Sequence, residues 1–107
     1  MKQHSELYDA AVPEVYKAAV ATVRDLGFST SQLVPDQAIH ASTKRRLLNP
    51  HSVQPVQIIV IQERDKTKVS MHVGFEDQRL VHVSIGDVAA RRRAVKEVFE
   101  GITERLT

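Results

Sequence analysis

The chain has 107 residues, of which 42% are hydrophobic and 26% charged. This composition is typical of one globular domain and not of a disordered segment. There is no cysteine, which excludes disulfides, thiol catalysis and cysteine-based zinc sites. The formal net charge is only +2, an excess too small to indicate a nucleic-acid or membrane partner by itself. We expect one domain, 1–107, with residues 1–5 disordered, and no membrane span, because no run approaches about 18 apolar residues.

The first predicted elements are a short strand from Glu6 to Ala10, with Leu7 or Tyr8 pointing inward, and a helix at 13–26. Apolar residues recur in this helix at the three-and-four spacing of one helical face; they are Val12, Val15, Tyr16, Ala19, Val23 and Leu26. Pro13 suits the first helical position, where its missing N–H costs nothing. Gly27 can adopt the left-handed conformation that ends a helix, with Phe28 folding back onto Val23.

After this helix the apolar residues alternate, which predicts strands. We expect strands over 28–34, 39–44, 56–62, 68–75 and 81–85, turns at 35–36, 65–66 and 76–79, and a proline-containing loop at 47–55. The segment 56–62 is nearly continuous Val, Ile and Gln, which is typical of a strand buried on both faces. In the next strand Val69, Met71, Val73 and Phe75 should point to one side.

Asp87 is expected to cap a second helix at 88–106. Its apolar face consists of Val88, Val95, Val98, Phe99, Ile102 and Leu106. A glycine inside a helix costs about 1 kcal/mol relative to Ala. Gly101 therefore either permits close packing against the Ala-rich first helix or is tolerated because it lies near a fraying helix end.

This order of elements predicts an α+β fold, with a single antiparallel sheet of about four to six strands and both helices packed on one face. The predicted core comprises Val23, Leu26, Phe28, Ile58, Val60, Val73, Val83, Val95, Phe99 and Ile102. Ile59 and Ile61 would then lie on the opposite face. With Leu47 and Leu48 they form a candidate surface for a protein partner or a homodimer, unless the loop 47–55 folds over them.

Three histidines, His40, His72 and His82, alternate with the inward apolar residues of their strands. His72 and His82 are candidate metal ligands if their strands form a hairpin. The alternative is a solvated sheet face without metal, and the sequence favours that alternative because it contains no recognised metal-binding motif. We therefore expect no cofactor.

Two basic clusters, Lys44-Arg45-Arg46 and Arg91-Arg92-Arg93, are candidates for binding an anion or nucleic acid. Three consecutive arginines on a helix point in three directions, and near the helix start they oppose the helix dipole. Aromatic residues are only 5% of the chain, whereas nucleic-acid modules usually add aromatic side chains that stack on bases. A solvated surface is therefore the favoured interpretation of both clusters.

No catalytic motif is present: the chain has no nucleophile elbow, no phosphate-binding glycine loop and no dinucleotide fingerprint. The sequence therefore favours a non-enzymatic interaction domain, although spacing alone does not exclude a catalytic triad.

Several segments resemble small bacterial envelope domains often found in lipoproteins, among them the helix-grip domains of an outer-membrane assembly lipoprotein. The segments are Val15 to Ala19 with Leu26-Gly27-Phe28, then Ala38 to Ala41, and Ile85-Gly86-Asp87. The resemblance implies an interaction or scaffold role in the periplasm or cell envelope, and it carries over no catalytic residue. The chain lacks the lipobox cysteine of that pattern, so a cytoplasmic protein that binds an anionic ligand or nucleic acid is the alternative.

Overall fold

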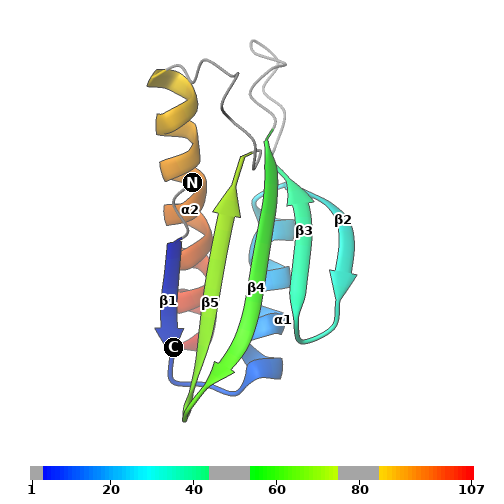
Figure 1. Cartoon of the computed structure of the whole chain (residues 1–107), viewed down its shortest axis with the longest axis vertical. Coiled ribbons are helices and arrows are strands. Elements are labelled where there is room, and N and C mark those ends of the chain that lie inside the picture. Colours follow the sequence, from blue (N-terminus) through cyan, green and yellow to red (C-terminus); the bar gives the residue numbers. More distant parts are fainter. Residues whose placement is uncertain (1–3, 44–53, 75–84) are drawn as a thin grey trace.

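The computed structural model describes residues 4–43, 54–74 and 85–107. In chain order these residues form β1 (His4–Tyr8), α1 (Val12–Asp25), β2 (Ser29–Val34), β3 (Ala38–Ser42), β4 (Pro55–Glu63), β5 (Lys66–Val73) and α2 (Ile85–Leu106). The strands pair antiparallel in one five-stranded sheet with the order β1-β5-β4-β3-β2 (Figure 1). The predicted α+β fold is therefore confirmed.

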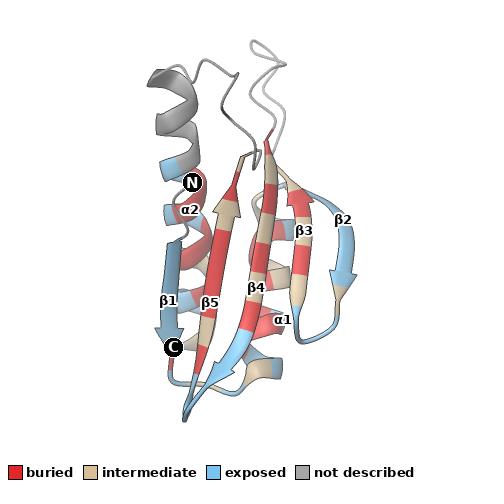
Figure 2. Ribbon diagram, in the orientation of Figure 1, coloured by how far each residue is buried: buried red, intermediate tan, exposed pale blue. Residues whose placement is uncertain are grey.

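Both helices lie on the same face of the sheet (Figure 1). Helix α1 packs over β4 and β2, α2 packs over β5 and β1, and the two helices contact each other. Buried residues alternate with less buried ones along the strands, as expected for a sheet with one covered face. On β4, for example, Val56, Ile58 and Val60 are buried between less buried neighbours (Figure 2). The opposite face carries no helix among the described residues.

The first helix ends at Asp25, one residue before the predicted end, and Gly27 adopts the left-handed conformation expected from the sequence. Gly27 has φ 82°, its N–H donates to the carbonyl of Arg24, and the N–H of Phe28 donates to the carbonyl of Val23 over 2.9 Å. This is the hydrogen-bond pattern of a Schellman motif, in which a left-handed glycine satisfies the last helical carbonyls.

The core forms between the helices and the covered face of the sheet. Its fully buried large side chains are Ile39, Ile58, Met71, Ile102, Val15, Val23, Val60, Val69 and Val98. Of the predicted core, Val23, Ile58, Val60, Val73, Val95, Phe99 and Ile102 are buried, while Leu26 and Phe28 are partly buried against it. Val83 lies outside the described residues.

Several sequence predictions about individual elements were wrong. His4 and Ser5 are not disordered, because they belong to β1 and pair with Met71 and Ser70. Ile85 is helical instead of ending a strand, since α2 begins there. Asp87 consequently lies inside the first turn of α2 and is not its cap. The loop predicted at 47–55 ends too late, because Pro55 already belongs to β4, and the turn predicted at 65–66 lies one residue earlier, because β5 begins at Lys66. Residues 47–53 of that loop, the turn at 76–79 and the strand at 81–84 lie outside the described residues.

The hairpin between β2 and β3 has two irregularities. The N–H of Gln37 donates to the carbonyl of Val34 over 3.0 Å, and Asp36 has φ 59°. This is a type II turn, with Pro35 and Asp36 at its centre. Three residue pairs beyond the turn, Ser31 has no partner in the register and forms a bulge, and its hydroxyl donates to the carbonyl of His40 over 3.1 Å.

Candidate functional site

The uncovered face of the sheet carries apolar side chains next to an ion pair. Leu7 on β1 and Ile61 on β4 both pair with Lys68 on β5, so the three side chains share one face. Leu7 is 55% exposed and Ile61 is 48% exposed. Lys68 pairs with Glu63 over 3.9 Å. We call Leu7, Ile59, Ile61, Glu63 and Lys68 the open-face cluster.

The expectation that 56–62 is buried on both faces was wrong. Ile59 is only half-buried and Ile61 is exposed, because no described element packs on that side of β4. Leu47 and Leu48, expected beside them, lie outside the described residues. The alternation within 56–62 therefore placed Ile59 and Ile61 on the face away from the helices, where they lie, and it missed Leu7, whose position depends on β1 pairing with a strand about sixty residues away.

The histidine candidates are separated by a strand. His40 on β3 and His72 on β5 both pair with Gln57 on β4, which lies between them. In the part of the chain that is described, no group of three or more metal-ligating side chains comes together. Nε2 of His72 is buried and has no hydrogen-bond partner among those residues. His82 lies outside them.

The basic clusters are only partly described. Arg92 and Arg93 are exposed on α2, which is consistent with a solvated surface. Lys44, Arg45, Arg46 and the side chain of Arg91 lie outside the description.

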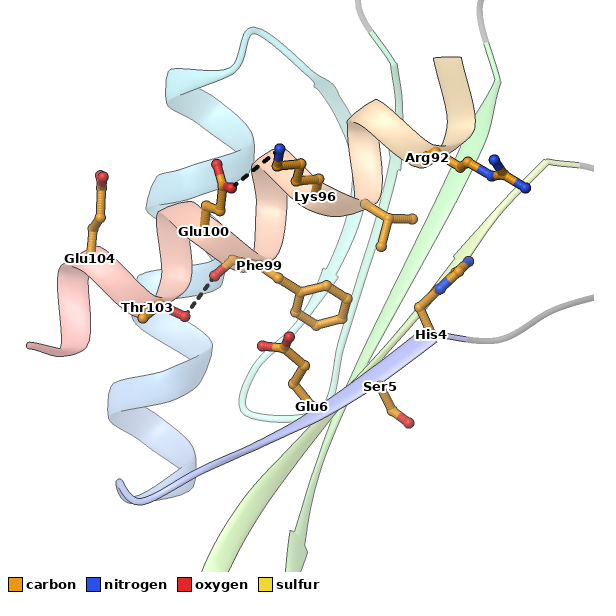
Figure 3. Close-up of a pocket in the computed structure, with 10 residues that line it drawn as sticks. His4, Ser5, Glu6, Arg92, Lys96, Phe99, Glu100, Thr103 and Glu104 are labelled. Atoms are coloured by element: carbon orange, nitrogen blue, oxygen red, sulfur yellow. Dashed lines mark hydrogen bonds and ion pairs between the residues drawn. The ribbon is translucent and has the colours of Figure 1, made fainter. Parts of the chain in front are cut away.

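A second site, absent from the sequence analysis, is a groove between β1 and the outer side of α2. It encloses about 650 Å³ and contains both apolar and charged side chains (Figure 3). We call it the β1–α2 groove; its lining residues are His4, Ser5, Glu6, Arg92, Val95, Lys96, Phe99, Glu100, Thr103 and Glu104. Sequence reasoning had no means to find it, because it forms only when the two ends of the chain meet.

Tyr8, at the end of β1, connects two residues that line the groove, Glu6 and Phe99. Its hydroxyl lies 3.1 Å from Oε2 of Glu6 and 3.3 Å from the carbonyl oxygen of Phe99, so it can donate to either acceptor. Burial raises the pKa of Tyr8 to about 12, Glu6 adds to the rise, and a hydrogen bond with Thr103 opposes it. Tyr8 therefore stays neutral at physiological pH and ties β1 to α2.

The charges of the groove are segregated along its length. His4 and Arg92 lie at one end, and Glu100 and Glu104 lie toward the other, with the ring of Phe99 between them (Figure 3). Lys96 pairs with Glu100 over 4.0 Å at the rim. The groove therefore has ends of opposite charge, with the ring of Phe99 and the carboxylate of Glu6 between them (Figure 3).

Within the described residues no helix is long and apolar enough to span a membrane. No protein-family model matches the chain, and no curated protein matches it significantly. Among solved structures, the chain is similar to the crystal structure of CalU16 from Micromonospora echinospora, with a TM-score of 0.50 and 17% sequence identity. The match covers 96% of this chain and 81% of CalU16. At this level of identity the likeness concerns the fold alone.

Proposed function

We propose that this chain is a non-enzymatic interaction domain of the bacterial cell envelope that associates through the open face of its sheet, with a second copy of the chain as its partner. The observation that supports this proposal is the alignment of Leu7 and Ile61 on either side of Lys68. Both aliphatic side chains are about half exposed on a face where no described helix packs. Burying such a side chain fully contributes about 1.5–3 kcal/mol.

The charges of the open-face cluster suit a two-fold contact. In a symmetric dimer the same surface meets itself, so each residue contacts its counterpart's neighbours. Lys68 and Glu63 lie 3.9 Å apart within one chain, and two facing copies can exchange these partners across the axis. Two sheets that pack face to face are about 10 Å apart, a distance that aliphatic side chains from both copies fill.

Sedimentation velocity over a concentration series tests self-association. We expect the wild-type chain to dimerise and Ile61→Lys to weaken the dimer at least tenfold, because the new charge would be buried at the interface. Leu33→Lys is the matched control: Leu33 is 37% exposed, but it pairs with Ile39 on the helix-covered side of the sheet. A monomeric wild type at high concentration, or equal effects of the two substitutions, would contradict the proposal.

The envelope location is supported by the resemblance of the helix, glycine and strand segments to envelope domains. Fractionation of the source cells, with an antibody against this domain, tests it separately from dimerisation. We expect the protein in the envelope fraction; recovery with the cytoplasmic proteins would favour the alternative location.

A further inference from the structure

We propose that β1 and α2 together bind an extended peptide segment of a partner protein, which adds to the free edge of β1 and places alternate side chains in the β1–α2 groove. This surface is distinct from the open-face cluster. The proposal therefore goes beyond self-association, and it rests on three features of the groove: an available strand edge, a helix wall of suitable length and an ordered distribution of charge.

The strand edge is available because β1 is the outermost strand of the sheet. In the described part of the chain its only strand partner is β5, and four of its five residues, His4 to Leu7, are exposed. An edge strand presents a row of unpaired N–H and C=O groups. An extended peptide satisfies such groups by main-chain hydrogen bonds, while pockets for alternate side chains supply selectivity.

The wall of the groove is a stripe on α2. Arg92, Lys96, Glu100 and Glu104 recur every fourth residue and line the groove, so they form a slanted stripe that winds gradually around the helix. At 1.5 Å per residue this stripe is about 18 Å long. An extended strand rises about 3.3 Å per residue, so the wall matches a peptide of about five or six residues.

The distribution of charge defines the sequence of the peptide. His4 lies beside Arg92 at the start of β1, and Tyr8 lies beside Phe99 and Thr103 further along α2, so β1 and α2 run in the same direction. A peptide that adds antiparallel to β1 therefore ends near Arg92. Its alternate side chains should be basic opposite Glu104, apolar over the ring of Phe99 and acidic beside Arg92.

The probe is a synthetic peptide, Thr-Lys-Thr-Leu-Thr-Glu-Thr, with both ends blocked. The first control exchanges its Lys and Glu, which keeps the composition and reverses the charge order. The second control keeps the sequence and N-methylates alternate amides on the side that faces β1, which removes the donors of a strand pair. Two such peptides are prepared, one for each set of alternate amides, because either set can face β1 in an added strand.

Binding is followed by amide chemical shifts of the labelled chain. We expect the probe to shift β1 and the stripe on α2, and we expect the charge-exchanged peptide and one of the N-methylated peptides to bind at least tenfold more weakly. In the double variant Arg92→Glu, Glu104→Arg the preference should reverse, with the charge-exchanged peptide binding more tightly. Loss of folding does not produce such a reversal, so this result is specific to the groove.

Three results would overturn the proposal: no shifts at millimolar probe, equal binding of the two charge orders, or equal binding of every N-methylated peptide. The variant Ile61→Lys separates this proposal from self-association. We expect it to bind the probe as the wild type does, whereas shifts that require Ile61 would place the peptide on the open face and contradict binding in the groove.

Discussion

Gly101 on α2 lies directly against Thr22 on α1, where a Cβ atom on Gly101 would overlap Cγ2 of Thr22 and lie 3.1 Å from its Oγ1. Thr22 is itself held in place, because it is 1% exposed and its hydroxyl donates to the carbonyl of Ala18 over 2.8 Å. Of the two interpretations of Gly101, close contact with the first helix is therefore correct. Near the same end of the helices, Arg105 pairs with Asp25.

Gly101→Ala should lower the free energy of unfolding despite its better helix propensity. The propensity gain is about 1 kcal/mol, whereas overpacking a fixed contact typically costs about 1–3 kcal/mol. Denaturant unfolding measures the difference. In a Thr22→Ala background the clash with Cγ2 is absent, so the same substitution should become neutral or stabilising. An identical effect in both backgrounds would show that the helices separate freely.

Phe99→Ala should be far more damaging than His72→Ala. Phe99 is 7% exposed and belongs to the core, so its truncation should cost about 3–5 kcal/mol. His72 lies on the opposite face of the sheet with Nε2 lacking a partner in the described chain, and its loss should cost less than about 1 kcal/mol. Thermal or urea unfolding of both variants checks the contrast; equal losses would mean that both faces of the sheet are buried.

At position 36, glycine should be more stabilising than alanine. Asp36 has φ 59°, a conformation that costs an ordinary L-residue about 1–2 kcal/mol and glycine almost nothing. The free energy of unfolding of Asp36→Gly should therefore exceed that of Asp36→Ala by about 1 kcal/mol. Urea unfolding of both variants measures this difference. At a position with negative φ the order reverses, because glycine gains more entropy on unfolding. Gln37, next in the chain, provides that comparison through Gln37→Gly and Gln37→Ala.

Tyr8 should make stability fall in strongly alkaline solution. Its pKa rises from an ordinary 10.0 to about 12 in the folded chain, chiefly through burial. Below pH 10 both states keep the proton and stability is unaffected; between pH 10 and about 12 the unfolded state loses it first, so the free energy of unfolding declines. Tyr8→Phe should lack this part of the decline. Burial also raises the pKa of Tyr16, so the difference in tyrosinate absorbance between wild type and Tyr8→Phe isolates Tyr8; a difference that titrates near 10 would contradict the prediction.

The parts of the fold that the sequence revealed depend on local chemistry. Gly27 marked the end of α1 because only a left-handed residue closes that motif, and the alternation of Val69, Met71 and Val73 placed their strand correctly on the core. The start of α2 was missed because Asp87 is a plausible cap whether or not the helix begins two residues earlier. Local preference does not decide between such neighbouring starts.

Only those parts of the candidate sites that depend on the residue pattern within a single strand could be predicted from the sequence. Ile61 was recognised as facing away from the helices, because alternation within β4 is a local signal. Leu7 and the whole β1–α2 groove were not, since the contact between Tyr8 and Phe99 joins positions 91 residues apart. Nothing in the pattern of either segment specifies which distant element it meets.

The bulge at Ser31 makes the two outer strands of the sheet unequal. An edge strand interrupted by a bulge is twisted away from the flat geometry that another strand needs, so β2 is a poor template, whereas β1 is regular along its length. A molecule with two receptive edges could accept a neighbour at each and extend without limit into a filament. With one receptive edge, the sheet can take up one added strand at β1, and growth of the sheet stops once that edge is occupied.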